Sequence, residues 1–318
     1  MCLLPFSKWM FLIVMTSGAG LAFGQAYPVK PVRLGTSAIG GGADGVARIL
    51  GPAMSANLGQ QVVVENRATG MATVELFVKA PPDGYNFLLY NNTVWVSPLL
   101  ENASYDALRD LLPVTLVAQS PNILVVHPAL PVHTVKDLIT MARGKPGALD
   151  YATGVTGASN HIAGELFQSM AKIKLTRVPY KNGATQAADL MSGYVQIMFA
   201  SASMTPYIKS GRLRGVAVAS PQPSPLFPGL PTIASAGLAG YESGSHYVIF
   251  APLKTPEPML SKFNQEAVRF LKSPEAKERY LNAGMEAVGS TPAELGALIK
   301  TDIARLSKVI KDTGMREK

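Results

Sequence analysis

The sequence predicts an α/β protein with largely parallel sheets. Short apolar runs, typical of strands, alternate along the chain with longer segments of helical periodicity. Most of these runs are apolar throughout, which is the pattern of strands buried on both faces. Several helical segments also begin with recognisable start signals. Together these observations predict sheets that helices cover on both faces.

The predicted strands are short apolar runs bounded by polar or turn-forming residues. Their alternation with helical segments favours parallel pairing. They span residues 32–34, 62–64, 87–90, 123–126, 195–199, 215–219 and 247–251.

The clearest helix start lies near residue 292. The hydroxyl residue Thr291 precedes Pro292, and the acidic Glu294 follows in the first turn. Ser273 and Pro274 repeat this pattern, so the last two helices are predicted to begin at these prolines. The predicted helices span residues 46–58, 134–142, 161–170, 185–191, 257–271, 274–283 and 292–311.

The first 24 residues have the order of a secretory signal peptide. Lys8 precedes an apolar stretch at residues 9–15, and small residues follow through Gly24. The apolar stretch is shorter than the roughly 20 residues that a spanning helix needs. We therefore predict a signal peptide at residues 1–24, with cleavage after Gly24 or Ala26, and export to the periplasm. A buried N-terminal strand is the alternative.

The composition fits an exported protein of about two domains. The 318 residues carry a formal net charge of +8, which becomes +7 when Lys8 leaves with the signal peptide. Cys2, the one cysteine, lies in the same segment, so no disulfide is expected in the mature chain. Basic residues are scattered and do not form the clustered patch that nucleic acid requires. We expect a monomer without a nucleic-acid partner.

A glycine-rich loop at residues 40–45 carries the most specific motif. It reads Gly-Gly-Gly-Ala-Asp-Gly, a G-x-G-x-x-G between a predicted strand and a predicted helix, and Glu65 follows about 20 residues later. One interpretation is a dinucleotide site, and hence an NAD-dependent oxidoreductase. Export of an unfolded chain without cofactor disfavours this interpretation. Because the backbone N–H groups of such a loop bind anions in general, another anion is the alternative.

Signatures of catalysis and of metal binding are absent from the sequence. No His-Glu-x-x-His, Cys-x-x-Cys or Gly-x-Ser-x-Gly pattern occurs. The histidines, His127, His133, His161 and His246, are dispersed along the chain. We therefore predict no catalytic residue, no metal site, no cofactor and no enzymatic activity.

Several short segments, spread over nearly the whole mature chain, match segments that occur in the same order in one protein family. They read YPVKPVR at 27–33, VVVENR at 62–67, KAPPDGY at 79–85, LVVHP at 124–128, HIAGELF at 161–167, VPYK at 178–181, LPT at 230–232 and VGSTP at 288–292. Each alone is weakly specific, but the ordered set is specific. By these segments the chain resembles the periplasmic substrate-binding proteins of tripartite tricarboxylate transporters, the Bug family.

The resemblance implies a type II periplasmic binding-protein fold, in which two α/β lobes enclose a ligand cleft. Lobe 1 is expected at residues 27–120 plus 248–318 and lobe 2 at 121–247, with crossings near 123–126 and 247–251. Closure of the lobes on a small organic carboxylate is implied, followed by delivery to membrane transporter subunits. A periplasmic sensing partner of a signalling system has the same fold and stays as the alternative.

By this resemblance the first glycine-rich loop holds a ligand carboxylate. Its N–H groups stand at a helix start, where the helix dipole is positive; a plain tight turn is the alternative. The acidic side chain at position 44 is also expected to cap its own helix. Relatives commonly carry a proline and an aromatic residue before the glycines, and their absence here puts the floor of the site in doubt. The expected contacts are Ser37, Ala38, Ile39, Gly40, Gly41, Gly42 and Asp44.

A second glycine-rich loop, at residues 154–161, is implied as the other half of the clamp. His161 is either a donor to the carboxylate or a structural capping partner. Relatives often have a hydroxyl residue where Ala158 stands, so Thr156 or Ser159 is expected to substitute for it. The expected contacts are Thr156, Gly157, Ala158, Ser159 and His161.

The ends of two further strands are implied as contacts. Asn91, Asn92 and Thr93 follow one strand, where polar residues either face a ligand or form an ordinary turn. Ala200 and Ser201 follow another, where relatives usually carry an Asp-Asn pair. Loss of that aspartate favours a plain carboxylate over an amino acid. The variable positions are small or apolar, which favours a larger or partly apolar acid as the ligand. They are Ala38, Ile39, Ala158 and Ala200.

Overall fold

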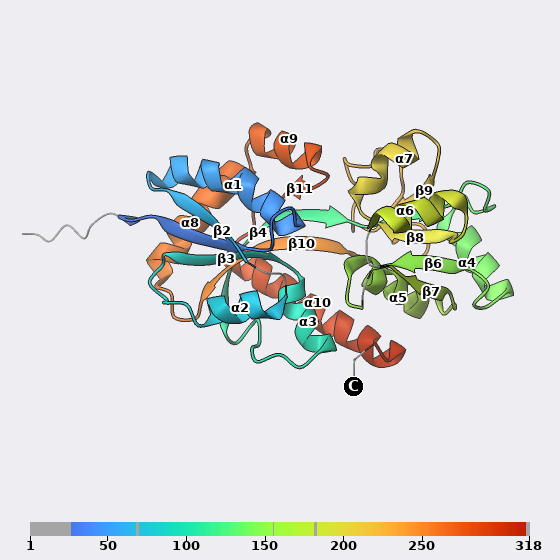
Figure 1. Ribbon diagram of the computed structural model, residues 1–318, viewed down its shortest axis with the longest axis horizontal. Coiled ribbons are helices and arrows are strands. Elements are labelled where there is room, and N and C mark those ends of the chain that lie inside the picture. The colour runs from blue at the N-terminus through green and yellow to red at the C-terminus, as the bar shows by residue number, and fades with distance from the viewer. Residues whose placement is uncertain (1–26, 68–69, 155, 181–182, 316–318) are drawn as a thin grey trace, which may run out of the picture.

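The computed structural model describes residues 27–67, 70–154, 156–180 and 183–315. These residues form two lobes that lie side by side, each built on its own sheet (Figure 1). The predicted signal peptide and Cys2 lie outside the described residues. No helix within the described ranges is long and apolar enough to cross a membrane. The two-lobed α/β fold predicted from the sequence is confirmed.

Lobe 1 contains a six-stranded sheet in the order β11-β4-β10-β3-β1-β2. Strand β1 pairs in parallel with β2 and β3, whereas β10 runs antiparallel to β3 and β4. The sheet is therefore mixed. Its strands are β1 (Val32–Thr36), β2 (Val62–Asn66), β3 (Asn86–Asn91), β4 (Leu111–Pro121), β10 (Gly244–Pro252) and β11 (Glu286–Ala287).

Helices cover both faces of this sheet, and each face has its own apolar core. On one face, Phe87 of β3 stacks on Phe263 with ring centroids 3.8 Å apart. On the other, Trp95 lies edge-on to Phe250 of β10. The first face carries α1 (Gly42–Leu58), α8 (Glu257–Leu271) and α9 (Pro274–Asn282); the second carries α2 (Met71–Val78), α3 (Thr93–Leu100) and α10 (Pro292–Thr313).

Lobe 2 contains a five-stranded sheet in the order β7-β6-β8-β5-β9. Strands β5 (Ile123–Val126), β6 (Asp150–Thr153), β7 (Thr176–Pro179), β8 (Ile197–Ala200) and β9 (Arg214–Val218) form it. Helices α4 (Val135–Gly144) and α5 (Ser159–Ala171) pack on one face. Helix α6 (Gly183–Ser192), the 3-10 turn η1 (Ala202–Met204) and α7 (Thr205–Lys209) pack on the other.

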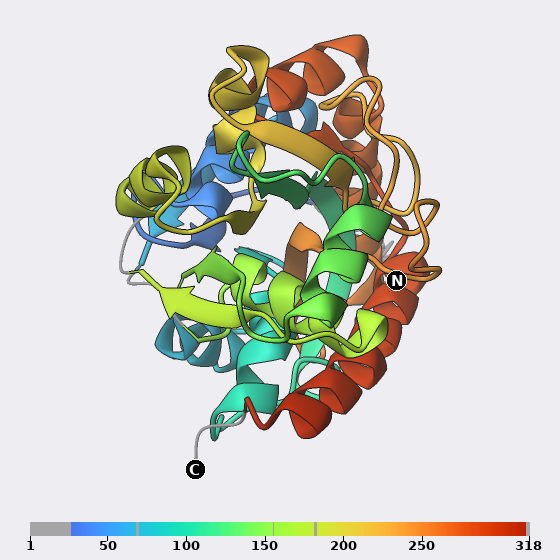
Figure 2. The ribbon, with the colours of Figure 1, turned by 90° about the vertical axis from the view of Figure 1, so that its right-hand side faces the viewer.

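Two strands and one helix connect the lobes. Strand β4 leads from lobe 1 into β5 of lobe 2, and the chain returns on β10, which pairs with β4 over its whole length. Helix α10 runs from lobe 1 toward α5, along the lower right of Figure 2. Its residue Val309 packs in the core of lobe 2. Because β10 begins at Gly244, residues 244–247 pair in the first sheet, although they fall within the range expected for lobe 2.

The prediction of largely parallel sheets was wrong. Strand β5 runs antiparallel to both of its neighbours, β8 and β9, and β10 runs antiparallel to its two neighbours. The physical reason is the double crossing: a chain that enters lobe 2 along one strand and returns beside it must reverse direction. Among the named strands of the described residues, parallel pairing occurs in the β1, β2, β3 group and between β6 and its neighbours β7 and β8.

The helix start signals read from the sequence correspond to capping interactions. Thr291 and Glu294 form a capping box at the start of α10, with Pro292 in the first turn. The Ser273 hydroxyl accepts a hydrogen bond from the Ala276 N–H at the start of α9. These caps fix two helices of lobe 1.

Candidate ligand-binding cleft

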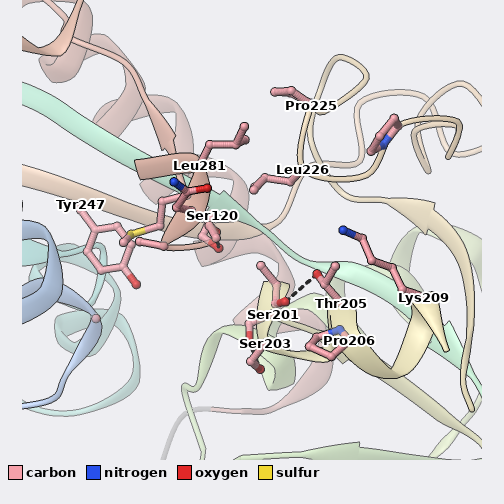
Figure 3. Close-up of a pocket in the computed structure, with 17 residues that line it drawn as sticks. Ser120, Ser201, Ser203, Thr205, Pro206, Lys209, Pro225, Leu226, Tyr247 and Leu281 are labelled. Atoms are coloured by element: carbon pink, nitrogen blue, oxygen red, sulfur yellow. Dashed lines mark hydrogen bonds between the residues drawn. The ribbon is translucent and has the colours of Figure 1, made fainter. Parts of the chain in front are cut away.

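Two adjoining cavities lie between the lobes. The larger has a volume of about 860 Å³ and the smaller about 230 Å³. They share Ser120 and Tyr247 from the crossing strands and Ser201 and Ser203 from the segment after β8. Figure 3 shows the larger cavity, with Tyr247 at one end. Both cavities are therefore built at the junction of the lobes.

Each cavity has its own chemical character. The smaller is lined mainly by polar groups: Ser120, Asn122, Ser159, Asn160, Gly183, Gln186, Met198, Ser201, Ser203, Met204, Ser245 and Tyr247. The larger combines hydroxyls with apolar side chains and one cation: Gly42, Ser120, Ser201, Ala202, Ser203, Thr205, Pro206, Lys209, Pro225, Leu226, Pro228, Tyr247, Leu281, Asn282, Ala283, Gly284 and Met285.

The first glycine-rich loop ends at the N-terminus of α1, beside the larger cavity. Gly40 adopts a φ of +80°, a left-handed conformation that favours glycine. The Gly40 N–H donates to Asp44 Oδ2 at 2.9 Å, and the Gly41 N–H donates to the Ala38 carbonyl at 3.0 Å. These two glycine N–H groups thus build the loop and are not free for a ligand.

The first turn of α1 supplies the free donors. Its N-cap, Gly41, makes no side-chain capping bond. Among the described residues, the N–H groups of Gly42 and Ala43 have no hydrogen-bond acceptor. Unpaired first-turn N–H groups at the positive end of a helix dipole form an anion site. Of the three consecutive glycines at 40–42, only Gly42 therefore keeps an N–H group without an acceptor, together with Ala43.

Asp44 positions this loop. Its carboxylate is 3% exposed and accepts hydrogen bonds from the Gly40 N–H, from Arg48 and from Asn66. Burial alone would raise its pKa, but the bonds from Asn66, Arg48 and Gly40 outweigh burial and hold the pKa below its usual range. Asp44 is thus ionised and fully engaged in holding the loop.

Tyr247 touches the same helix start from the crossing strand β10. A Cβ atom placed on Gly42 would lie 2.2 Å from the Tyr247 hydroxyl oxygen. A glycine is therefore required at position 42 for the hydroxyl to approach the α1 N-terminus. Burial raises the pKa of Tyr247, so its hydroxyl remains a neutral hydrogen-bond donor at pH 7.

Ser37 lies beneath the loop with an unsatisfied hydroxyl. It is 5% exposed, and its Oγ has no hydrogen-bond partner among the described residues. A Cβ atom on Gly41 would lie 2.7 Å from this Oγ. An unpaired buried hydroxyl is energetically costly, and here it stands next to the unpaired first-turn N–H groups of α1.

The second glycine-rich loop leads into α5 from lobe 2. The Gly154 N–H donates to Asn160 Oδ1 at 2.9 Å, and the Gly157 N–H donates to His161 Nδ1 at 3.2 Å. Within the described ranges, the N–H groups of Ser159 and Asn160 have no acceptor. A second helix start thus presents free donors to the smaller cavity.

His161 braces the second loop. It is 2% exposed, and its Nε2 lies 3.9 Å from Glu165 Oε1. Burial, together with the nearby positive charge of Arg177, lowers the pKa of His161 to about 4. The ring is therefore neutral at pH 7 and holds Gly157 through Nδ1, which corresponds to the structural alternative considered for this residue.

This buried histidine predicts a pH dependence of stability. The unfolded chain takes up a proton on His161 near pH 6.5, whereas the folded protein does so only near pH 4. The unfolded state binds more protons between these values, so stability falls as the pH falls. We expect protonation of His161 in the unfolded chain to lower the free energy of unfolding by about 2–3 kcal/mol between pH 7 and pH 4.5.

Urea unfolding of the wild type and of His161→Asn at both pH values measures this contribution. Over the same interval, the free energy of unfolding of the variant should fall by about 2–3 kcal/mol less than that of the wild type. The variant lacks the titrating histidine, whereas the carboxylates contribute equally in both proteins. Equal losses in the two proteins would show that folding does not lower the pKa of His161.

The other predicted contacts lie in several different environments. Asn91 bonds to Thr93, and Asn92 donates to the Gly244 carbonyl at 3.3 Å beside the lobe junction. Ala200 is buried at the end of β8. Ile39 is 78% exposed at the tip of the first loop. Of the predicted residues, Gly42, Ser159 and Ser201 line the two main cavities.

Three predicted residues of the second loop line neither of the two cavities. Thr156 Oγ1 lies 3.5 Å from Arg177, whose guanidinium also donates to the Gly154 carbonyl at 3.2 Å. A Cβ atom on Gly157 would meet Leu100 of lobe 1 at 2.7 Å. Ala158 is the N-cap of α5. This loop thus contacts lobe 1 as well as the cleft.

Sequence reasoning missed several lining residues. Tyr247 and Ser120 come from the crossing strands, and Asn122 accepts hydrogen bonds from Ser159 and Ser243 between them. A polar or aromatic residue at a predicted crossing is the signal that marks such positions. Lys209, which also lines the larger cavity, lies in no sequence motif that would have marked it. Among the described residues, no cluster of His, Cys, Asp and Glu could hold a metal ion.

Comparison with known proteins identifies the family. The model of the tripartite tricarboxylate transporter family receptor matches residues 46–315. Protein BugT of Bordetella pertussis is 29% identical over 315 residues, which cover 96% of this chain and 97% of the relative. The family that the ordered segments predict is thereby confirmed.

Two solved structures from Rhodopseudomonas palustris share the fold. One, solved with adipate, is 33% identical with a TM-score of 0.75 and covers 91% of this chain and 98% of its own. The other, MatC with bound malate, is 25% identical with a TM-score of 0.72 and covers 89% of this chain and 100% of its own. The chain belongs to the tripartite tricarboxylate transporter receptor family, whose members are periplasmic solute-binding proteins.

Proposed function

We propose that this protein captures a small organic carboxylate in its interlobe cleft and delivers it to the membrane subunits of a tripartite tricarboxylate transporter. The adipate and malate bound by the two R. palustris relatives support this class of ligand. The receptor is proposed to act in the periplasm as a monomer, after removal of residues 1–24. It is proposed to have no catalytic activity.

One observation carries the proposal: two helices from opposite lobes direct unpaired first-turn N–H groups toward adjoining cavities. Helix α1 offers Gly42 and Ala43, and α5 offers Ser159 and Asn160. No carboxylate side chain lies among the described residues that line either cavity. Such a site favours a bound anion and disfavours a cation.

Capture then depends on lobe closure. The donors of α1 and α5 belong to different lobes, so one ligand engages both sets only when the lobes approach each other. Exclusion of water strengthens these hydrogen bonds, because the local dielectric constant falls. The hydroxyls of Tyr247 and Ser201, together with ordered water, are proposed to complete the contacts.

A thermal-shift screen of the mature protein tests the proposal. The ligands are monocarboxylates, dicarboxylates, tricarboxylates, aromatic acids, amino acids and NAD. A ligand that binds only the folded state raises the melting temperature, so we expect a shift with one or more carboxylates. Two outcomes would contradict the proposal: a shift with NAD alone, or no shift with any of the acids.

The same screen tests the ligand subclass. Ser201 and Ala200 stand where relatives usually carry an Asp-Asn pair, so no acid is present there to bind an ammonium group. We therefore expect plain acids to bind more tightly than amino acids of the same skeleton. Tighter binding of aspartate or glutamate than of their deaminated analogues would contradict this.

A further inference from the structure

The larger cavity carries one positive charge at some distance from the helix starts. Lys209 is the single charged residue among the described residues that line the two main cavities. It lies in the last turn of α7, in lobe 2. In Figure 3, Lys209 and Tyr247 stand at opposite sides of the cavity, with Ser120, Ser201 and Thr205 between them.

The ammonium group of Lys209 has no anionic partner. Within the described ranges, no carboxylate lies within ion-pair distance of it. By contrast, Arg33, Arg67 and Arg48, near the first loop, each pair with a carboxylate. Lys209, an exposed side chain, therefore lines the cavity without an ion-pair partner.

An apolar wall lines the path between the two ends of the cavity. Leu226 comes from the proline-rich segment of lobe 2, whereas Leu281 and Met285 come from lobe 1. Figure 3 shows Leu226 and Leu281 on the same side of the cavity, opposite Ser203 and Thr205. Leu281 is 39% exposed, so part of its apolar surface is open to the cavity. An apolar ligand segment that runs along this wall would bury it.

We propose that Lys209 forms a second anion subsite, separate from the first-turn donors of α1 and α5. The ligand is then an elongated acid with a carboxylate at the helix starts, an apolar middle against Leu226 and Leu281, and a second anionic group at Lys209. This inference rests on the proposed function and names the ligand class for it. A charge-assisted hydrogen bond to an ammonium group is among the stronger polar contacts in proteins.

The geometry sets a length requirement. The start of α1 and Lys209 line different parts of the larger cavity, of about 860 Å³, and the start of α5 lines the adjoining smaller cavity, so a short diacid is expected to reach only the first subsite. A longer diacid reaches both subsites and also buries methylene groups against the wall. Each buried methylene strengthens binding by about fourfold. The advantage of a diacid over a monoacid should therefore appear only above a certain chain length.

Isothermal titration calorimetry with linear acids of about four to ten carbons tests this, using monoacids and diacids of equal length. The proteins are the wild type, Lys209→Met and the control Lys136→Met. Lys136 is an exposed lysine of α4, at the outer end of lobe 2. The control therefore removes the same charge from the same lobe, away from the cleft.

We expect the wild type and Lys136→Met to prefer long diacids over monoacids of equal length by about 10-fold to 100-fold. Lys209→Met should lose this preference and retain the wild-type affinity for monoacids. Lys209→Arg should retain most of the preference, because the charge is kept. Loss of the preference only in Lys209→Met assigns the subsite to this residue.

The opposite results would overturn the inference. A diacid preference of the same size in Lys209→Met and in the wild type would exclude Lys209 as the subsite. Equal binding of long diacids and monoacids by the wild type would also exclude it, while leaving the proposed function intact. If no acid in the series binds the wild type, the proposed function itself fails, and the subsite fails with it.

Discussion

Replacing Gly42 with alanine is expected to weaken carboxylate binding by about 100-fold while the protein stays folded. The new methyl group would lie 2.2 Å from the Tyr247 hydroxyl oxygen, so the tyrosine must move away from the α1 N-terminus. The methyl group also stands at the first-turn N–H groups that an anion would approach. Loss of charge-assisted hydrogen bonds of about 1.5–3 kcal/mol corresponds to roughly 10-fold to 150-fold in affinity.

Gly45→Ala is the matched control. It lies in the same helix, three residues further on, and a Cβ atom there meets nothing within 4 Å. The control substitution favours the helix by about 0.5–1 kcal/mol. We expect Gly45→Ala to keep its affinity within about threefold. Calorimetric titration with the acid that gives the largest thermal shift measures both variants.

A double variant separates the two causes of the loss. Gly42→Ala with Tyr247→Phe removes the 2.2 Å contact with the hydroxyl oxygen and leaves two ring carbons at 3.0 and 3.1 Å, which a shift of a few tenths of an ångström relieves. If displacement of the ring is the main cause, the double variant should bind more tightly than Gly42→Ala alone. Unchanged affinity in Gly42→Ala would instead show that the start of α1 does not hold the ligand.

Replacing Asp302 with alanine is expected to lower the free energy of unfolding by about 3–5 kcal/mol. Asp302 is 5% exposed in α10 and accepts a hydrogen bond from Trp95 Nε1 at 2.7 Å. It also pairs with Arg305 at 2.6 Å, and Arg305 donates to the Glu242 carbonyl. Without Asp302, a buried indole N–H and a guanidinium lose their partner.

This cluster joins the lobes, so its loss affects the hinge as well as the core. Trp95 belongs to α3 of lobe 1, and Glu242 lies just before the crossing strand β10. Urea unfolding measures the loss of stability. Asp312→Ala, at an exposed position near the end of the same helix, is the control and should change stability by less than about 0.5 kcal/mol. Equal effects of the two substitutions would contradict the role of Asp302.

Elements with strong local signals could be predicted from the sequence. Helix α8 spans 257–271 and strand β5 spans 123–126, as their periodicity indicates. Helix α10 begins at Pro292, where the hydroxyl, proline and acid stand together. In these segments the local preferences agree with the tertiary environment, so short-range reasoning is sufficient.

Elements that depend on tertiary contacts could not be predicted. Strand β4 contains Thr115, Gln119 and Ser120, so it lacks a continuous apolar run. Buried Thr115 is satisfied by Ser290, 175 residues away. Helix α3 contains Pro98 within eight residues and buries four apolar side chains, the largest being Trp95. Helix α1 begins at Gly42, four residues before the predicted start. The low helix propensity of glycine concealed this first turn from sequence reasoning.

The candidate site shows the same division. The glycine-rich motifs located both helix starts in the cleft, but not which N–H groups are free. That assignment depends on Asp44 and His161, which engage the N–H groups of Gly40 and Gly157. Tyr247 enters the site from a strand about 200 residues further on, and only the fold brings it to Gly42.

Calorimetric comparison of a linear carboxylic acid with its primary amide tests the central claim most directly. The two molecules have nearly the same size, but only the acid is an anion at pH 7. If first-turn N–H groups of α1 and α5 hold the ligand, the acid should bind the wild type at least about 100-fold more tightly, with weaker binding at high salt. Equal affinities of acid and amide would contradict an anion site at the two helix starts.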